Sequence, residues 1–515
     1  MFENHDPVML TFDCGTQSIR ALLFTAEGNI IDKEKIVFEP TYFSKKPGWA
    51  EQEPEFYFDK LCEASMTLKE RNAEVWENII AVTITTFRDS FVNLDKDGNV
   101  LRPVFLWLDQ RTARCEEPIP VTSAMCFAAL GMNDVINSSR KASRSNWIRE
   151  NEPEIWEKTD KFLMLSGYLI YKLTGNFADS NASQAGHVPF DYKNKKWMGK
   201  SNVKYCIFNI ERSMLPDLVE PGDELGKITK EAAEKSGIKE GLPLIASGSD
   251  KSCETLGGGA IYKNMANLSY GSAASMQITT ERYVEPQPFL PAYPAVFPDH
   301  YNPEIQVYRG YWMITWFLNE FAKEERIIAS EKNVSPEEIV NKLLLETPPG
   351  CDGLILQPYW GPGLENPEAK GSVIGFSDVH TRSHFYRAII EGVGYALLDG
   401  LESVSKRAKQ NIDIITVSGG GSQSDVICGM TADIFGRSVR RVQTYETAGL
   451  GSSIAGFVGM KVFSDFDSAI KSMVRVRDTF EPRRENAEKY REIFDKIYKK
   501  IYPCLKGLYK EMRKI

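Results

Sequence analysis

The chain has 515 residues, of which 42% are hydrophobic and 26% are charged. These fractions are typical of a folded globular protein and exclude the disordered and fibrous classes. Lysine and arginine number 62 and aspartate and glutamate 70, so the net charge is −8. Because an acidic chain lacks the electrostatic footprint of a nucleic-acid binder, we expect no nucleic-acid partner.

The sequence predicts neither a membrane span nor a secreted protein. No apolar run approaches the roughly 18 residues of a membrane-spanning helix. Residues 1–6 contain no lysine or arginine and so lack the basic region of a signal peptide. The nine cysteines are scattered without a C-x-x-C pair, which favours reduced thiols over a disulfide framework. We therefore expect a cytoplasmic protein with no membrane partner.

The chain begins with two β-prone runs separated by a polar turn. Residues 8–12 are apolar, residues 13–16 interrupt the run with Asp13 and Gly15, and residues 19–24 resume it. This pattern predicts a strand, a polar glycine turn and a second strand.

The rest of the first half predicts further strands and one helical region. Residues 79–84 are typical of a buried strand and lead into the polar segment 85–89. The apolar residues of 143–174 recur at helical spacing. Residues 242–246 form another apolar run, and Asp250 follows it closely.

The second half repeats this style. Residues 266–270 and 276–280 predict two strands joined by the small-residue turn 271–275. Residues 412–417 predict a strand that runs into Gly419, Gly420 and Gly421, and a helix-like segment follows. We expect two related α/β halves.

We place the domain boundary at the glycine run 257–259. The predicted domains are residues 1–257 and residues 258–515, and the charged, periodic stretch 484–515 predicts a helical C-terminal tail.

Four polar glycine turns are candidate ligand sites. The turn from Asp13 to Arg20 offers a carboxylate to Mg²⁺ and backbone N–H groups to phosphate, although a plain β-turn has the same composition. The Gly271 turn is a weaker copy of it. Three consecutive glycines from Gly419 allow close ligand approach, or form a flexible loop. Asp250 follows a strand, where α/β sheets bind ligands, but aspartate also caps helices.

The Gly199-Lys200-Ser201 tripeptide is not a P-loop. A P-loop begins with a glycine five residues before its lysine-preceding glycine, and Asn194 occupies that position here. The sequence therefore does not predict a Walker-type NTPase.

With these four turns, the sequence resembles the FGGY carbohydrate kinases, the family of glycerol, xylulose and ribulose kinases. The resemblance extends along nearly the whole chain. Phe376 replaces an aliphatic residue of the C-terminal signature, and Arg144 replaces a lysine of the N-terminal one. The matching segments are residues 13–20, the W-x-D-x-R-T segment 107–112, residues 371–376 and 384–391, residues 419–421 and 432–436, and residues 446–451.

The resemblance implies an α/β fold of two ribonuclease-H-like (actin-like ATPase) domains with a deep cleft between them. The N-terminal domain would carry the sugar or polyol and the first phosphate motif, and the C-terminal domain would carry the nucleotide. Closure of the cleft would exclude water and limit wasteful ATP hydrolysis. The implied activity is ATP-dependent phosphorylation of a small sugar or polyol, by a chain that is a homodimer or a homotetramer.

The resemblance also assigns residues to this chemistry. Asp250 matches the family's catalytic base, and Asp13 would hold Mg²⁺ through water. The ATP and phosphate contacts that it implies are Thr16, Gln17, Arg20, Gly271, Ser272, Gly420, Gly421, Ser422 and Asp425.

Arg88 and Asp89 are the candidate acceptor site. They align with the Arg-Glu pair that binds the polyol in glycerol kinases, whereas the Met-His pair of xylulose kinases is missing. Donors beside acceptors suit neighbouring hydroxyls. The alternative is a surface salt bridge, which contributes little. The sequence does not distinguish among ketoses, pentuloses, glycerol and tetritols as the acceptor.

Two other classes of protein with the same fold are alternatives to a kinase. One is a non-catalytic sensor of sugar or nucleotide, and the other is an actin-like assembly ATPase. The presence of Asp250 favours an enzyme because a sensor needs no base. Polar residues at the N-terminal strand ends favour a small acceptor over self-assembly.

Overall fold

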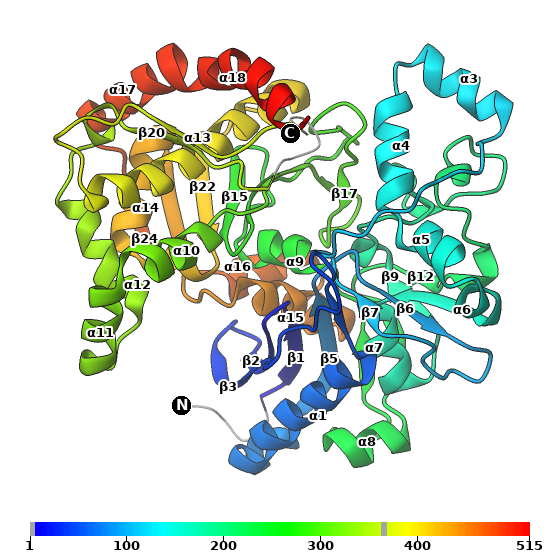
Figure 1. Cartoon of the computed structure of the whole chain (residues 1–515). Helices are drawn as coiled ribbons and strands as arrows, with labels where there is room; N and C mark the ends of the chain where they lie inside the picture. The colour runs from blue at the N-terminus through cyan, green and yellow to red at the C-terminus, as the bar shows by residue number, and fades with distance from the viewer. Residues whose placement is uncertain (1–5, 362–367, 515) are drawn as a thin grey trace.

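The computed structural model describes residues 6–361 and 368–514 and contains one six-stranded sheet in each half (Figure 1). In spatial order the first sheet comprises β3 (Ile30–Val37), β2 (Ser18–Thr25), β1 (Val8–Cys14), β5 (Ile79–Thr86), β14 (Pro243–Ile245) and β13 (Glu224–Lys227). The second comprises β19 (Glu304–Val307), β16 (Ala274–Ile278), β15 (Met265–Tyr270), β22 (Ile414–Ser418), β23 (Ser438–Val442) and β24 (Val476–Phe480).

The two sheets share one pairing pattern. From β3 to β13 the neighbours pair antiparallel, antiparallel, parallel, parallel and antiparallel. From β19 to β24 the order is the same. The β1–β2 hairpin therefore corresponds to β15–β16, and the end of β5 corresponds to the end of β22. This repetition confirms the prediction of two related α/β halves.

Helices cover the sheets and bury their apolar residues. On the first sheet lie α1 (Pro54–Arg71) and α7 (Leu165–Thr174), with α8 (Lys230–Ser236) beside them. On the second sheet lie α13 (Arg382–Ala408) and α14 (Asp425–Phe435), against which α17 (Arg484–Ile493) packs.

A lateral lobe extends from the first half (Figure 1). It is built on a four-stranded sheet of β4 (Glu51–Gln52), β7 (Val104–Phe105), β6 (Phe91–Leu94) and β8 (Lys161–Met164). Its helices are α3 (Val121–Ala129), α4 (Asn133–Ala142), α5 (Arg144–Asn151) and α6 (Pro153–Lys158), and it has a separate apolar core.

Two helices join the halves at the centre of the molecule (Figure 1). Helix α9 (Asp250–Gly257) packs on α15 (Thr447–Gly459) and on β15 of the second sheet. Helix α15 in turn packs on β1 and β5 of the first sheet. Their backbones nearly touch, since a Cβ atom on Gly451 would lie 1.9 Å from the carbonyl oxygen of Cys253. A Cβ on Gly257 would lie 2.0 Å from the carbonyl oxygen of Thr447, so only glycine fits at both positions.

The structure corrects two details of the predicted elements. Strand β1 continues through Asp13 and Cys14, so the turn that was expected to begin at Asp13 spans only residues 15–17. The helical prediction for 143–174 is interrupted by β8, which pairs with β6. Three of the four residues of β8 are buried, and a short buried run gives no periodicity that separates strand from helix.

The C-terminal tail is helical as predicted, through α17 and α18 (Lys499–Met512), with a π-helical turn between them. The absence of a signal peptide was judged on residues 1–6, of which residues 1–5 lie outside the described residues. In the part of the chain that the structure describes, no helix is both long and apolar enough to cross a membrane.

The crossing of α9 and α15 gives the first prediction. Changing Gly451 to Ala forces the two backbones apart, because its Cβ has no space against α9. Overpacking of this kind typically costs about 1–3 kcal/mol, so the Gly451→Ala variant should melt at a lower temperature and lose catalytic activity. Differential scanning calorimetry measures the first effect.

Gly507→Ala is the matched control. Gly507 lies in helix α18 with no atom within 4 Å of its would-be Cβ, so alanine there should be neutral or slightly stabilising. Equal melting temperatures for the two variants would contradict the role given to the crossing.

Candidate active site

A cavity of about 1140 Å³ lies between the halves and is lined by both. The strands β1, β5 and β14 run parallel, so their carboxyl ends meet at one edge of the first sheet. Most of the sequence-predicted site residues open onto this cavity. Those that line it are Thr16, Gln17, Arg20, Arg88, Asp89, Asp250, Gly271 and Ser272.

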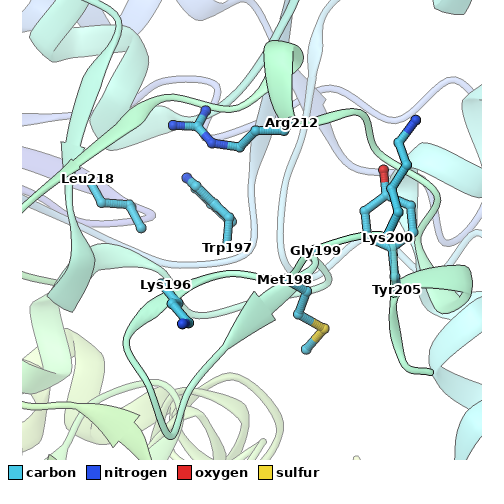
Figure 2. Close-up of a pocket in the computed structure, with 8 residues that line it drawn as sticks. All are labelled: Lys196, Trp197, Met198, Gly199, Lys200, Tyr205, Arg212 and Leu218. Atoms are coloured by element: carbon cyan, nitrogen blue, oxygen red, sulfur yellow. The ribbon is translucent and has the colours of Figure 1, made fainter. Parts of the chain in front are cut away.

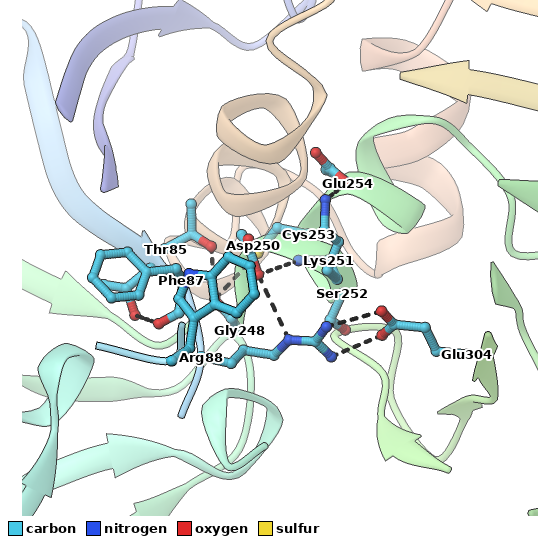
Figure 3. Close-up of polar contacts among 12 residues, drawn as sticks. Thr85, Phe87, Arg88, Gly248, Asp250, Lys251, Ser252, Cys253, Glu254 and Glu304 are labelled. Carbon is cyan, nitrogen blue, oxygen red and sulfur yellow. Dashed lines mark hydrogen bonds and ion pairs between the residues drawn. The ribbon is translucent and has the colours of Figure 1, made fainter. Parts of the chain in front are cut away.

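Asp250 is the first residue of α9, directly after the segment that follows β14 (Figure 3). Ser249 occupies the N-cap position, so the alternative in which Asp250 caps the helix is wrong. Its Oδ1 accepts a 2.8 Å hydrogen bond from the backbone N–H of Lys251 and lies 3.9 Å from Nε of Arg88.

The environment of Asp250 suits a general base. Burial raises its pKa above the ordinary value of 3.8, although the charges of Lys251 and Arg88 act in the opposite direction. The nearby carboxylate of Glu254 raises it further. A base with a raised pKa binds the proton of an alcohol more readily.

Asp13 ends strand β1 beside a chain of alternating charges. Its Oδ2 accepts a 3.1 Å hydrogen bond from Nη1 of Arg20. Nε of Arg20 lies 3.2 Å from Glu446, the residue that precedes α15. Glu446 also pairs at 2.9 Å with Lys33 on β3. Arg20, predicted as a phosphate contact, is therefore held between two carboxylates that come from different halves.

The charge around Asp13 favours a bound cation. Burial raises the pKa of Asp13 to about 6; Arg20 opposes this, but Glu446, Asp250 and Glu254 all push it upward. Within residues 6–361 and 368–514, no three His, Cys, Asp or Glu side chains gather closely enough to hold a metal by themselves. These residues fit Mg²⁺, which commonly takes one or two carboxylates and completes its shell with water and phosphate.

The two predicted phosphate turns occupy equivalent hairpins. The indole N–H of Trp107 donates a 2.9 Å hydrogen bond to Oγ1 of Thr16 and holds that side chain in place. In the second half, the backbone N–H of Tyr311 donates to the carbonyl of Gly271, and the next N–H donates to the carbonyl of Ser272. Helix α10 (Trp312–Phe321) is anchored to the turn in this way.

The glycine run at the end of β22 does not line this cavity. It forms a short helical turn before α14, next to β15 and hence on the Gly271 side of the second sheet. The hydroxyl of Ser422 donates to the carbonyl of Gly419 at 2.7 Å, and Asp425 pairs at 2.6 Å with Arg441. Both side chains have internal partners, and their nucleotide contacts stay a prediction.

Arg88 and Asp89 do not pair with each other. Nη1 and Nη2 of Arg88 donate to the two carboxylate oxygens of Glu304 at 2.7 and 2.9 Å (Figure 3). The guanidinium also lies over the ring of Tyr293. Asp89 accepts from the backbone N–H of His187 at 2.8 Å, and its Oδ2 lies 2.9 Å from Nδ1 of that ring. The alternative of a surface salt bridge between the two neighbours is therefore wrong.

Asp89 stays a carboxylate despite its burial. Burial alone would raise its pKa, but the charge and hydrogen bonds of His187, together with the charge of Arg144, lower it below 3.8. Its backbone has a φ of 55°, a left-handed conformation that aspartate and asparagine tolerate better than most residues.

Sequence reasoning missed three ionisable residues of the site. His187 and Glu304 are the partners of Asp89 and Arg88, and each is remote from its partner in sequence. Lys251 lines the cavity and bonds Glu254 at 2.9 Å and Ser269 at 2.7 Å. Of the three, only Lys251 could have been found from the sequence, because it directly follows Asp250.

The Gly199-Lys200-Ser201 tripeptide, which is not a P-loop, lies at a different pocket of about 370 Å³ (Figure 2). The pocket surrounds Trp197 on the short strand β11 (Lys196–Trp197). Lys200 pairs with Glu211 there, and none of the predicted site residues lines this pocket.

Solved structures share this architecture. A xylulose kinase from Lactobacillus acidophilus superposes with a TM-score of 0.82 over 98% of this chain and 100% of that chain, at 20% identity. The protein therefore has the two-domain fold of the actin-like ATPases, which confirms the predicted fold class.

The chain belongs to the FGGY family of carbohydrate kinases. The N-terminal domain model of that family matches residues 8–257, and the C-terminal domain model matches residues 266–460. The uncharacterized sugar kinase YgcE of Escherichia coli is 28% identical over 96% of this chain and 93% of its own length. A xylulose kinase of Lactococcus lactis is 26% identical over 96% of both chains. The protein is a phosphotransferase that takes ATP and a sugar or polyol as its substrates.

The glycine run gives a prediction for nucleotide binding. A Cβ on Gly420 meets no atom within 4 Å, so the Gly420→Val variant should fold normally and obstruct only what binds there. We expect weaker ATP binding by isothermal titration, because a β-branched side chain blocks close approach to the backbone.

Gly421→Val is a less specific test, since its Cβ would lie 2.5 Å from the ring of Tyr311 and disturb the packing itself. An unchanged ATP affinity in folded Gly420→Val protein would place the adenosine pocket elsewhere.

Proposed function

We propose that the enzyme transfers the γ-phosphoryl group of ATP in line to a hydroxyl of a small sugar or polyol, with Asp250 as the general base. Asp250 accepts the hydroxyl proton as the new oxygen–phosphorus bond forms, and ADP leaves with the electrons of the broken bond. The observation that carries this proposal is that Asp250 opens onto the same cavity as both hairpin turns and the Arg88–Asp89 segment.

In this proposal the phosphates bind between the turns. Thr16 and Gln17 contact them from the first half, and the Gly271–Ser272 turn contacts them from the second. Asp13 holds Mg²⁺ through water, and the ion neutralises charge on the phosphates. The carboxylates around Asp13 support this assignment, because their mutual repulsion is relieved by a cation.

The adenosine binds at the end of β22, against Gly420 and Gly421. We place the domain division between residues 257 and 258, so closure of the cleft brings the nucleotide of the second domain to the acceptor of the first. The acceptor binds against Arg88, Asp89 and Asp250. The carboxylate of Asp89, kept ionised beside His187, accepts hydrogen bonds from substrate hydroxyls.

Replacing Asp250 tests the proposal. The Asp250→Asn variant keeps the shape of the side chain and loses its basicity, so kcat should fall by at least about 10²-fold. ATP binding by titration calorimetry should be nearly unchanged, because Asp250 contacts the acceptor. Near-normal turnover in this variant would exclude Asp250 as the base.

Replacing Asp89 tests the acceptor site. Asp89→Asn preserves the left-handed backbone conformation and removes the charge, so it is a cleaner change than alanine. We expect kcat/KM for the acceptor to fall by about tenfold or more, because hydroxyl donors lose a charged partner. The KM for ATP should stay the same, and an equal effect on both substrates would contradict this assignment.

A further inference from the structure

Arg88 belongs to a polar ring that joins helix α9 to the second sheet. Figure 3 shows the contacts of Arg88 with Glu304 and Asp250. Both Nη groups of Arg88 are bound by Glu304, the first residue of β19. Glu304 also accepts a 2.9 Å hydrogen bond from the amide of Gln277 on β16, and Gln277 accepts one from the hydroxyl of Thr255 on α9. Nε of Arg88 faces Asp250 and completes the ring.

The ring crosses the cleft between the halves. Arg88 directly follows β5 of the first sheet, whereas Glu304 and Gln277 lie on the second. The Glu304 carboxylate is only 3% exposed, and two donors hold it in one orientation. A charged bidentate pair in such a site is strong and directional.

Without Glu304, Arg88 would have one obvious partner. Its guanidinium already lies 3.9 Å from Oδ1 of Asp250, beyond a hydrogen bond but within reach of a small rotation. A freed guanidinium fork would form a bidentate pair with the Asp250 carboxylate. Both oxygens of the Asp250 carboxylate would then be bound by the guanidinium. The adjacent positive charge would also lower the affinity of the carboxylate for a proton.

We propose that Glu304 is a positioning residue that holds the Arg88 guanidinium away from Asp250 and so keeps the carboxylate open to the acceptor hydroxyl. Because Glu304 comes from the second half, the base is open only when the halves are together. This inference rests on the proposed role of Asp250 as the base.

The test is a double-mutant cycle between Glu304 and Arg88. ADP release is measured with the member of the series glycerol, erythritol, D-xylulose and D-ribulose that stimulates it most. Glu304→Gln should lower kcat by at least about tenfold and change the KM for ATP by less than about twofold, because Arg88 and Asp250 face the acceptor and not the nucleotide. Glu304→Asp keeps the charge at a shorter reach and should give an intermediate kcat.

The decisive comparison is made in the Arg88→Met background. If Glu304 acts through Arg88, adding Glu304→Gln or Glu304→Asp to Arg88→Met should change kcat by less than about twofold. An equal loss in both backgrounds would overturn the inference, as would a normal kcat for the single Glu304 variants. If Glu304→Gln does not fold, the same comparison is made with Glu304→Asp in the wild-type and in the Arg88→Met background.

Two further variants separate the possible failures. Glu391→Gln removes a second buried glutamate from an arginine pair, 2.7 Å from Arg387 and away from the cavity, so it should lower the melting temperature without changing kcat. Asp250→Asn tests the base itself. An active Asp250→Asn enzyme would overturn the base assignment and this inference together, whereas an inactive one beside a fully active Glu304→Gln enzyme would overturn this inference alone.

Discussion

The contact between the backbones of α9 and α15 is the constraint on which the rest of the structure depends. Each helix follows the last parallel strand of its own sheet and packs on strands of the other half. Gly257 and Gly451 allow this because neither can carry a side chain at the crossing. The crossing brings the carboxyl ends of β1, β5 and β14 and the Gly271 turn after β15 to one cavity, and the first residue of α9 is Asp250.

The same geometry concentrates charge in the cleft. Asp13 lies at the end of β1, Asp250 begins α9 and Glu446 directly precedes α15. Burial, together with repulsion from Glu446 and Asp250, raises the pKa of Asp13. Arg20 and Arg88 each bind a carboxylate from the second half, Glu446 and Glu304 respectively. The two halves are therefore joined by the ion pairs of two cavity-lining arginines as well as by helix packing.

The sequence was sufficient to predict the central strands β1, β2, β5, β14, β15, β16 and β22 and the polar turns that follow them. Buried parallel strands such as β5 and β22 are continuous apolar runs, and the glycines that end them are visible without a structure. The partners of Arg88 and Asp89 could not be predicted. Glu304 lies 216 residues from Arg88 and His187 lies 98 residues from Asp89, and only the folded chain brings them together. Strand β8 was missed because a short buried run has no diagnostic period.

The central claim is that this cleft transfers phosphate to a small polyhydroxy acceptor rather than to water. The most direct measurement is ADP release by the wild-type enzyme with ATP and Mg²⁺, alone and with glycerol, erythritol, D-xylulose or D-ribulose. The account predicts that one acceptor stimulates ADP release by at least about 10²-fold over water, with one phosphorylated product formed per ADP, because the base and the closed cleft act only on a bound hydroxyl. Equal ADP release with and without every acceptor would contradict it.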